Sequence, residues 1–183
     1  CGNVSGVYTQ VITITDNTAP VWTTAAGALD ATLECSDAAG IALAQAAIPV
    51  ASDNCDVDVS NIVEVAGAFV PGMTCPQEGT YTNTWTVTDA CGNVSGVYTQ
   101  VITITDNTVP TWTTASGALD ATLECSDAAG IALAQAAIPV ATDNCDVDVA
   151  NIIEVAGAFV PGMTCPEEGT YTNTWTVTDA CGN

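Results

Sequence analysis

The sequence contains no lysine, arginine or histidine, whereas 21 aspartate and glutamate residues give it a formal net charge of −21. Without cationic side chains, the chain cannot make the phosphate contacts on which nucleic-acid binding depends, and anionic membranes repel it. Without histidine or lysine as a base, a nucleophilic triad is excluded, and acid–base chemistry would fall to carboxylates alone. We therefore expect no enzyme and no nucleic-acid partner.

Long apolar runs are absent too. None reaches the ~18 residues that a membrane-spanning helix needs, and the longest candidate, residues 41–50 (IALAQAAIPV), contains Pro49, so we expect no membrane insertion. The nine cysteines include no CxxC motif, and without histidine a zinc or iron–sulfur site is a poor interpretation. Paired disulfides explain the cysteines better. They predict an oxidising environment, and hence an extracellular or cell-surface protein.

What the sequence does contain is a repeat with a period of 90 residues. The stretch TDACGNVSGVYTQVITITDNTVP occurs in full at residues 88–110. Its second part stands at residues 1–20, with Ala19 in place of Val109, and its first part returns at residues 178–183. A repeat that begins and ends inside its own motif is expected of a slice from a longer tandem array. The copies differ at few positions, and we expect none of these substitutions to change the fold.

Alternating patterns predict short β-strands in each copy. Residues 11–16 (VITITD) and 97–106 alternate branched apolar side chains with threonine, as half-buried strands do. Residues 81–88 (YTNTWTVT) alternate as well. Ser36 is expected to cap a short helix that continues through the alanine-rich residues 41–47. The same face of one strand should carry Tyr81, Asn83, Trp85 and Val87, and shorter strands are expected at residues 22–24, 31–35, 48–52, 59–66 and 68–70.

The segments TWTVTDACGN, QVITITDNTAP, ATLEC and ASDNC together resemble the hyalin-type (HYR-like), immunoglobulin-like repeats found in tandem on bacterial surface proteins. The variant resembled is the cysteine-rich one of large secreted proteins of the Bacteroidota. The resemblance implies an all-β fold: tandem immunoglobulin-like β-sandwich repeats with one short helical segment per repeat. On this interpretation residues 1–16 are the final strand of a preceding or neighbouring repeat, residues 17–106 a complete repeat, and residues 107–183 a second repeat lacking its last strand.

The four cysteines of each copy allow three connectivities. In an immunoglobulin-like path, Cys35 and Cys75 flank strand ends at one end of the sandwich, whereas Cys55 and Cys91 lie in loops at the opposite end. We therefore predict the pairs Cys35–Cys75 and Cys55–Cys91 in the first copy, and Cys125–Cys165 and Cys145–Cys181 in the second.

The acidic turns predict a calcium site. The turn DNCDVD at residues 53–58 offers oxygen ligands at alternating positions, as a hard cation requires, although it lacks the full EF-hand pattern. In a sandwich, the last hairpin and the end of the preceding copy lie at the same end as this turn. The alternative is that these side chains simply cap turns. The candidate ligands are Asp16, Asn17, Asp53, Asp56, Asp58 and Asp89, and in the second copy Asp106, Asn107, Asp143, Asp146, Asp148 and Asp179.

Two functions stay open at this point. The first is a structural extracellular protein, a tandem-repeat stalk or filament that assembles head to tail from disulfide-stapled modules. The alternative is a cell-surface adhesin whose loops bind a glycan or a protein. The loops DNCDVDV and TDACGNVSG are unchanged between copies, which favours the first, because a repeating axial contact needs the same surface each time.

Residues 7–16 suggest how copies associate. A lone strand exposes its hydrogen-bonding groups, and a sandwich without its last strand exposes a matching groove. Both are covered if residues 7–16 lie beside residues 171–178 of a neighbouring copy, with Cys1 paired to Cys145 of that neighbour. A continuous chain or strand donation between separate subunits would produce this arrangement. The expected partners are therefore other copies of the chain, joined head to tail as an open fibre.

Overall fold

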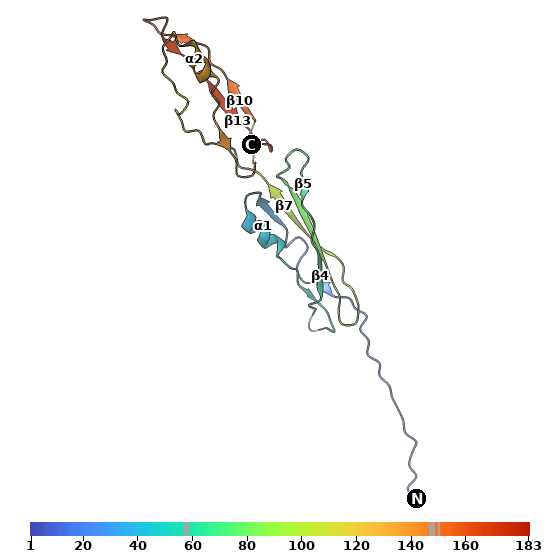
Figure 1. Ribbon diagram of the computed structural model, residues 1–183. Coiled ribbons are helices and arrows are strands. Elements are labelled where there is room, and N and C mark those ends of the chain that lie inside the picture. The colour runs from blue at the N-terminus through green and yellow to red at the C-terminus, as the bar shows by residue number, and fades with distance from the viewer. Residues whose placement is uncertain (57–58, 147–148, 150) are drawn as a thin grey trace. The chain divides into compact units, whose positions relative to one another are not determined.

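The computed structural model describes residues 1–56, 59–146, 149 and 151–183. The chain is mostly β, with two short helices, one in each copy, and is consistent with tandem β-sandwich repeats (Figure 1). Among these residues no helix is long and apolar enough to cross a bilayer. Two compact units are present, and they cut across the sequence copies. Unit 1 comprises Cys1–Leu29, Ala47–Gly67 and Asn83–Gln100, and unit 2 comprises Asp30–Ala46, Ala68–Thr82 and Val101–Asn183.

Antiparallel strand pairs build the described part of unit 1. β1 (Val21–Trp22) pairs with β3 (Ala51–Ser52). β4 (Ile62–Val65) pairs with the second half of β6 (Gly79–Val87), which confirms the alternating strand expected there. The expected strand at residues 97–106 is confirmed as β7 (Tyr98–Thr105), which begins in unit 1.

The core of unit 1 is built on the inward faces of β6 and β7. Trp85 and Val87 are fully buried, and Tyr98 lies between two tryptophans, with ring centroids 6.0 Å from Trp85 and 5.6 Å from Trp22. The Tyr98 hydroxyl donates to the Ala25 carbonyl at 2.9 Å. Such aromatic contacts add to the stabilisation that burial alone gives, so Tyr98 fixes β7 against the rest of the unit.

A series of hydrogen bonds between polar groups, the polar chain of Gly67, Asn83, Gln100 and Leu29, crosses the same core. The Asn83 amide donates to Gln100 Oε1 at 3.1 Å, and Gln100 Nε2 donates to the Leu29 carbonyl at 2.7 Å. The backbone N–H of Gly67 in turn donates to Asn83 Oδ1 at 2.9 Å. Because Asn83 and Gln100 are both buried, these bonds satisfy groups that would otherwise destabilise the fold, and they fix the register of β7 beside β6.

Unit 2 contains both helices and the remaining strands (Figure 1). β2 (Ala31–Glu34) pairs in parallel with β7, from Ala31 opposite Ile102 to Glu34 opposite Thr105. β5 (Val70–Pro71) pairs with the start of β6. The second copy contributes the antiparallel pairs β8 (Thr111–Trp112) with β9 (Ala141–Thr142), β10 (Ile152–Val155) with β13 (Thr174–Val177), and β11 (Val160–Pro161) with β12 (Gly169–Thr170).

The helices are α1 (Ala38–Gln45) and α2 (Ala128–Gln135). The expected cap, Ser36, is wrong by one residue. The side chain of Asp37 accepts the N–H of Gly40 at 2.9 Å, and Asp127 accepts that of Gly130 at the same distance. Ser36 is engaged elsewhere, since its hydroxyl oxygen accepts a hydrogen bond from Asn144 Nδ2 at 2.8 Å.

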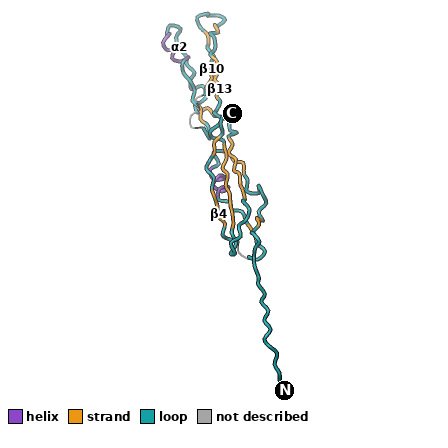
Figure 2. The backbone as a smooth tube through the Cα atoms, turned by 90° about the vertical axis from the view of Figure 1, so that its right-hand side faces the viewer, coloured by secondary structure: helices purple, strands orange, loops and turns teal. Residues whose placement is uncertain are grey.

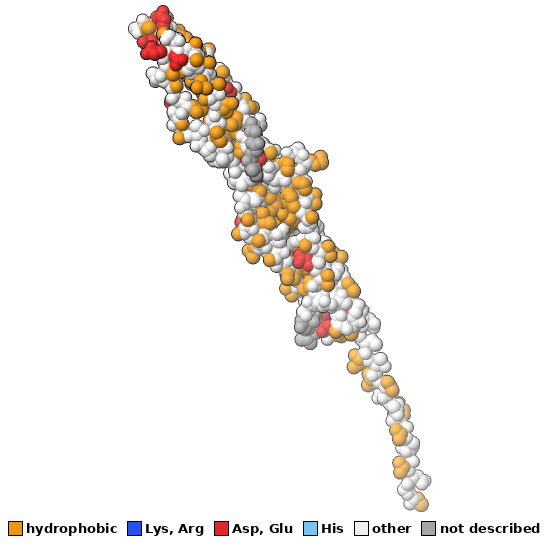
Figure 3. Space-filling model, in the orientation of Figure 1, with side chains coloured by type: hydrophobic (Ala, Val, Ile, Leu, Met, Phe, Trp, Pro, Cys, Tyr) orange, Lys and Arg blue, Asp and Glu red, His pale blue; other side chains and the backbone are white. Residues whose placement is uncertain are grey.

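The strand expected at residues 11–16 is not formed. Residues 1–20 carry no helix or strand and run as loop in Figure 2. Their apolar side chains, including Val7, Tyr8 and Ile12, are exposed, and hydrophobic side chains follow one another along this segment in Figure 3. The reason is that no strand among the described residues pairs with the segment, so its alternating pattern has no sheet to join.

Candidate functional site: a stapled joint between the copies

Two disulfides join the first sequence copy to the second, and both lie within unit 2. Cys35 follows β2 directly and is bonded to Cys145 in the turn after β9, with the Cα atoms 5.8 Å apart. Cys75 stands in the loop between β5 and β6 and is bonded to Cys181, with the Cα atoms 4.7 Å apart. The two bonds indicate an oxidising environment.

The predicted connectivity is therefore wrong. Cys35 and Cys75 both lie in unit 2, and Cys55 and Cys91 both lie in unit 1. Cys35 and Cys75 are not bonded to each other, however. Each is bonded to a cysteine in a turn of the second copy. The predicted pairs Cys35–Cys75 and Cys145–Cys181 are wrong, because these four cysteines form the two bonds between the copies. The predicted pair of Cys1 with Cys145 of a neighbour is wrong as well, because Cys145 is already bonded to Cys35. The predicted Cys55–Cys91 and Cys125–Cys165 bonds are not formed, since Cys1, Cys55, Cys91, Cys125 and Cys165 are free thiols.

Glu34 is the polar centre of the joint. Its Oε1 accepts hydrogen bonds from the Asn107 backbone N–H at 3.1 Å and from the Thr108 hydroxyl at 2.9 Å. The side chain of Asn144, in the second copy, lies 3.5 Å from the same oxygen. The backbone hydrogen bond from Asn107, followed by the side-chain bonds, lowers the pKa of Glu34, so the carboxylate stays charged while it holds the two copies together.

Besides the Asn144–Ser36 hydrogen bond, further side-chain hydrogen bonds cross the joint. Gln77 Nε2 donates to Asp146 Oδ1 at 3.1 Å, and Asn183 Nδ2 donates to the Asp106 carbonyl at 2.9 Å. Sequence reasoning missed both Glu34 and Gln77. For Glu34 the available signal was its place directly before a cysteine in each ATLEC segment, whereas Gln77 is replaced by glutamate at the equivalent position 167 and gave no signal.

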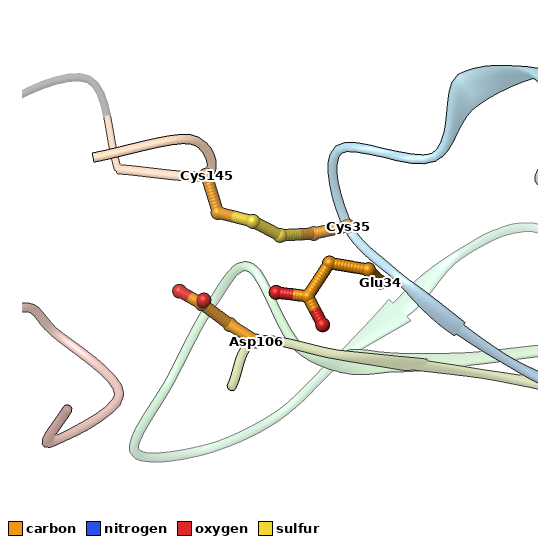
Figure 4. A group of neighbouring side chains, drawn as sticks. All are labelled: Glu34, Cys35, Asp106 and Cys145. Carbon is orange, nitrogen blue, oxygen red and sulfur yellow. A yellow bond between two sulfur atoms is a disulfide. The ribbon is translucent and has the colours of Figure 1, made fainter. Parts of the chain in front are cut away.

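Carboxylates gather beside the Cys35–Cys145 disulfide. Figure 4 shows Glu34 and Asp106 next to this bond, and ligand-type oxygens of Asp106 and Asp179 also lie within 4.8 Å of one another. Asp106 is only 3% exposed, and its pKa is raised by burial and by the charges of Asp143 and Asp179. The Oδ2 atoms of Asp106 and Asp143 are buried and accept no hydrogen bond. A buried carboxylate oxygen without a partner is destabilising unless a proton or a cation compensates it.

Asp179 behaves as a turn cap, in line with the alternative interpretation of the acidic residues. Its Oδ1 accepts the N–H groups of Cys181, Gly182 and Asn183, and its Oδ2 accepts the Asn183 amide. Burial would raise its pKa, but these bonds outweigh burial and lower it. Gly182 takes a φ of +97°, a conformation that favours glycine, which explains the glycine in TDACGN.

Unit 1 carries the equivalent acidic group of the first copy. Asp16, Asp53 and Asp89 offer carboxylate oxygens within 4.8 Å of one another, and Asp53 Oδ2 is buried without a hydrogen bond. Asn93 Nδ2 approaches the Asp16 carbonyl at 3.5 Å, as Asn183 approaches that of Asp106.

The structure thus brings together the aspartates at the centre of each predicted cluster, while the outer residues have other roles. Asp56 Oδ2 and Asp146 Oδ2 accept the N–H groups of Ala90 and Ala180 in the facing turns. Asn107 bonds Glu34, and exposed Asn17 bonds Thr15. Asp58 and Asp148 lie outside the described residues. Metal binding by these groups stays a prediction.

Comparison with known families bears on the first copy. Residues 23–104 match the family described as the HYR-like domain with 4 cysteines. This segment is a HYR-like domain. Its four cysteines are Cys35, Cys55, Cys75 and Cys91, of which the first and third are bonded to the second copy. No curated protein and no solved structure matches the chain.

Proposed function

We propose that this protein is a structural extracellular component, a stalk or filament in which HYR-like modules are joined head to tail by disulfides. The observation that carries the proposal is the pairing of Cys35 with Cys145 and of Cys75 with Cys181. A disulfide within a module would stabilise that module alone. Disulfides between modules, by contrast, add two covalent connections to the single peptide link, which is what a load-bearing array requires.

The polar contacts of the joint support the same function. Glu34 receives hydrogen bonds from Asn107 and Thr108 in the linking segment and from Asn144 in the next copy. With three separate points held, the second copy has little freedom to rotate about the linker. Because the residues that make these contacts recur with the repeat, each joint can be built in the same way.

Electron microscopy of the oxidised protein at high concentration tests this function. We expect unbranched filaments of regular width. Compact, unassembled particles that bind an immobilised glycan or protein would contradict the proposal and would favour the adhesin function instead.

We also propose that the joint binds a divalent cation such as Ca²⁺, because Asp106 Oδ2 and Asp143 Oδ2 are buried, unpartnered and close to further carboxylates. Oxygen ligands of this kind suit a hard cation. The test is the thermal unfolding temperature with Ca²⁺ and with excess chelator, in wild type, Asp143→Asn and the charge-matched control Asp120→Asn, which changes an exposed aspartate. Ca²⁺ should raise the temperature in wild type and in the control but less in Asp143→Asn. An equal response in all three proteins, or no response in any, would contradict the site.

A further inference from the structure

One eight-residue sequence, YTQVITIT, occurs twice in the chain in opposite environments. At residues 98–105 it forms β7, where Tyr98 is 4% and Ile102 0% exposed. At residues 8–15 it forms no strand, and the equivalent Tyr8 and Ile12 are 91% and 74% exposed. The same side chains that build the core of the first copy are thus presented to solvent near the N-terminus.

In the second copy, the place equivalent to that of β7 is not filled by any described strand. In the first copy β7 lies between β2 and β6. In the second copy, β13 pairs with β10 alone among the described residues, and residues 121–124, which correspond to β2, form no strand. The core on that side is open as well, since Trp112 and Leu123 are exposed and Trp175 is only half-buried. We call this region the open edge of β13.

We propose that the open edge of β13 binds residues 7–16 of another copy of this chain. The inference rests on the proposed filament function and names the partner of each joint. The occupant is identified by β7, which has the same sequence over eight residues and fills the equivalent place in the first copy. The parallel register of β2 with β7 then sets Ile12 opposite Ala121 and Ile14 opposite Leu123.

Aromatic packing supports the same register. In the first copy Tyr98 lies between Trp22 and Trp85, and its hydroxyl reaches the Ala25 carbonyl. In the assembled joint Tyr8 takes this place between Trp112 and Trp175, with its hydroxyl at the Ala115 carbonyl. Trp175 becomes buried when the strand binds, as Trp85 is beside β7, so its fluorescence reports the event.

The free thiols complete the joint. Cys125 and Cys165 stand 90 residues after Cys35 and Cys75, and Cys55 and Cys91 stand 90 residues before Cys145 and Cys181. Strand binding therefore brings Cys125 to Cys55 of the incoming copy, and Cys165 to its Cys91. Each bond forms by loss of two thiol protons and two electrons, and a small-molecule disulfide such as oxidised glutathione accepts the electrons and is reduced to two thiols.

One substitution makes this joint weaker than the joint inside the chain. Gln77 donates a hydrogen bond to Asp146, but the equivalent residues between chains are Glu167 and Asp56 of the incoming copy. Two carboxylates then face each other in place of an amide and a carboxylate. Glu167→Gln restores the hydrogen bond, so we expect this variant to associate roughly three- to tenfold more tightly than wild type.

The central test compares Ile12→Asp with Thr9→Asp in the 183-residue chain. Both positions are exposed in the free segment, and both variants add the same charge, so neither should change folding, which circular dichroism checks. On binding, residue 12 enters the core like Ile102, whereas residue 9 stays outside like Thr99. Sedimentation is carried out at about 0.15 M salt in a Cys55→Ser, Cys91→Ser background, which keeps the two disulfides within the chain and prevents the proposed bonds between chains. It should show association by the parent protein and Thr9→Asp, and at least roughly tenfold weaker association by Ile12→Asp.

The outcomes separate the two proposals. Wild type that forms no filaments and no oligomers overturns the function and the strand site together. Filaments whose assembly is equally sensitive to both substitutions, or to neither, overturn the strand site alone. After oxidation with glutathione disulfide, bonds mapped to Cys55–Cys125 and Cys91–Cys165 between chains support the joint, and any other pairing overturns the thiol assignment.

Discussion

The first and second copies are nearly identical in sequence, yet they differ in how much strand they form. In the first copy residues 79–87 make the single strand β6, whereas the equivalent residues of the second copy make only the short strands β12 and β13. β6 has β7 on one side and β4 and β5 on the other, whereas β13 pairs with β10 alone in the described part of the chain. The lesson is that neighbouring strands, more than intrinsic preference, decide whether this sequence forms a strand.

Replacing the equivalent tryptophans should give the largest difference between the copies. Trp85 is fully buried, so Trp85→Ala should lower the free energy of unfolding by about 3–5 kcal/mol. Trp175 is only half-buried, and Trp175→Ala should cost about half as much. Urea unfolding followed by circular dichroism measures both values, and equal losses would contradict the difference in burial.

The two copies of the YTQVITIT segment offer a second matched pair. Ile102→Ala removes a fully buried side chain and should cost about 2–4 kcal/mol, while Ile12→Ala in the exposed segment should change the unfolding free energy of the monomer by less than about 0.5 kcal/mol. The same urea titration applies, at a concentration low enough to keep the chain monomeric. A large loss from Ile12→Ala in the monomer would show that residues 8–15 already pack against the chain.

The polar chain predicts a smaller contrast. Asn83→Ala leaves the N–H of Gly67 and the amide of Gln100 without their bonds to residue 83, at a cost of about 1–3 kcal/mol. Asn173 accepts from Gly157 in the same way but is less buried, so Asn173→Ala should cost about 1 kcal/mol or less. Hydrogen exchange at Gly67 and Gly157, read by nuclear magnetic resonance, gives both values. If the two substitutions accelerated hydrogen exchange equally at Gly67 and Gly157, the bond between Asn83 and Gln100 would add nothing to the stability of the first copy.

The helix caps should show the least difference. Asp37 and Asp127 accept the N–H of the residue three positions later at the same 2.9 Å, in helices of the same length. Alanine at either position should therefore cost about 1 kcal/mol. Helical content against temperature measures the effect. A clearly larger loss of helical content in one variant than in the other would contradict this expectation. It would mean that the copies differ in their helices as well as in the presence of β7.

Local patterns in the sequence correctly predicted the two longest strands of the fold, β6 and β7. The alternation in YTNTWTVT placed Asn83, Trp85 and Val87 on one buried face, and residues 97–106 were correctly predicted as a strand. Residues 11–16 have the same pattern but no strand beside them, and the pattern alone cannot report that absence. Ser36 and Asp37 are both good caps, and the pattern alone does not choose between them; the aspartate caps both helices, Asp37 in α1 and Asp127 in α2.

The joint was harder to predict than the fold. Cys55 and Cys145 occupy equivalent positions, so the sequence cannot tell a free thiol from one bonded across the joint. Which applies depends on whether another copy lies opposite. Glu34 and Gln77 were missed for a related reason: their partners, such as Asn107 and Asp146, are about 70 residues away, and only the arrangement of the two copies brings them together.

The disulfide map of the oxidised chain tests the central claim most directly. Trypsin has no lysine or arginine to cut at, so cleavage at acidic residues or aromatics is required. In Cys125→Ser, where Cys35 holds the remaining ATLEC thiol, the peptide that contains Thr142 and Cys145 should be linked to the peptide that contains Cys35. The peptide with Cys75 and Gln77 should be linked to the one with Cys181. Cys35 linked to Cys75, or Cys145 linked to Cys181, would mean that the staples close each module on itself, and the account of a covalently joined array would be wrong.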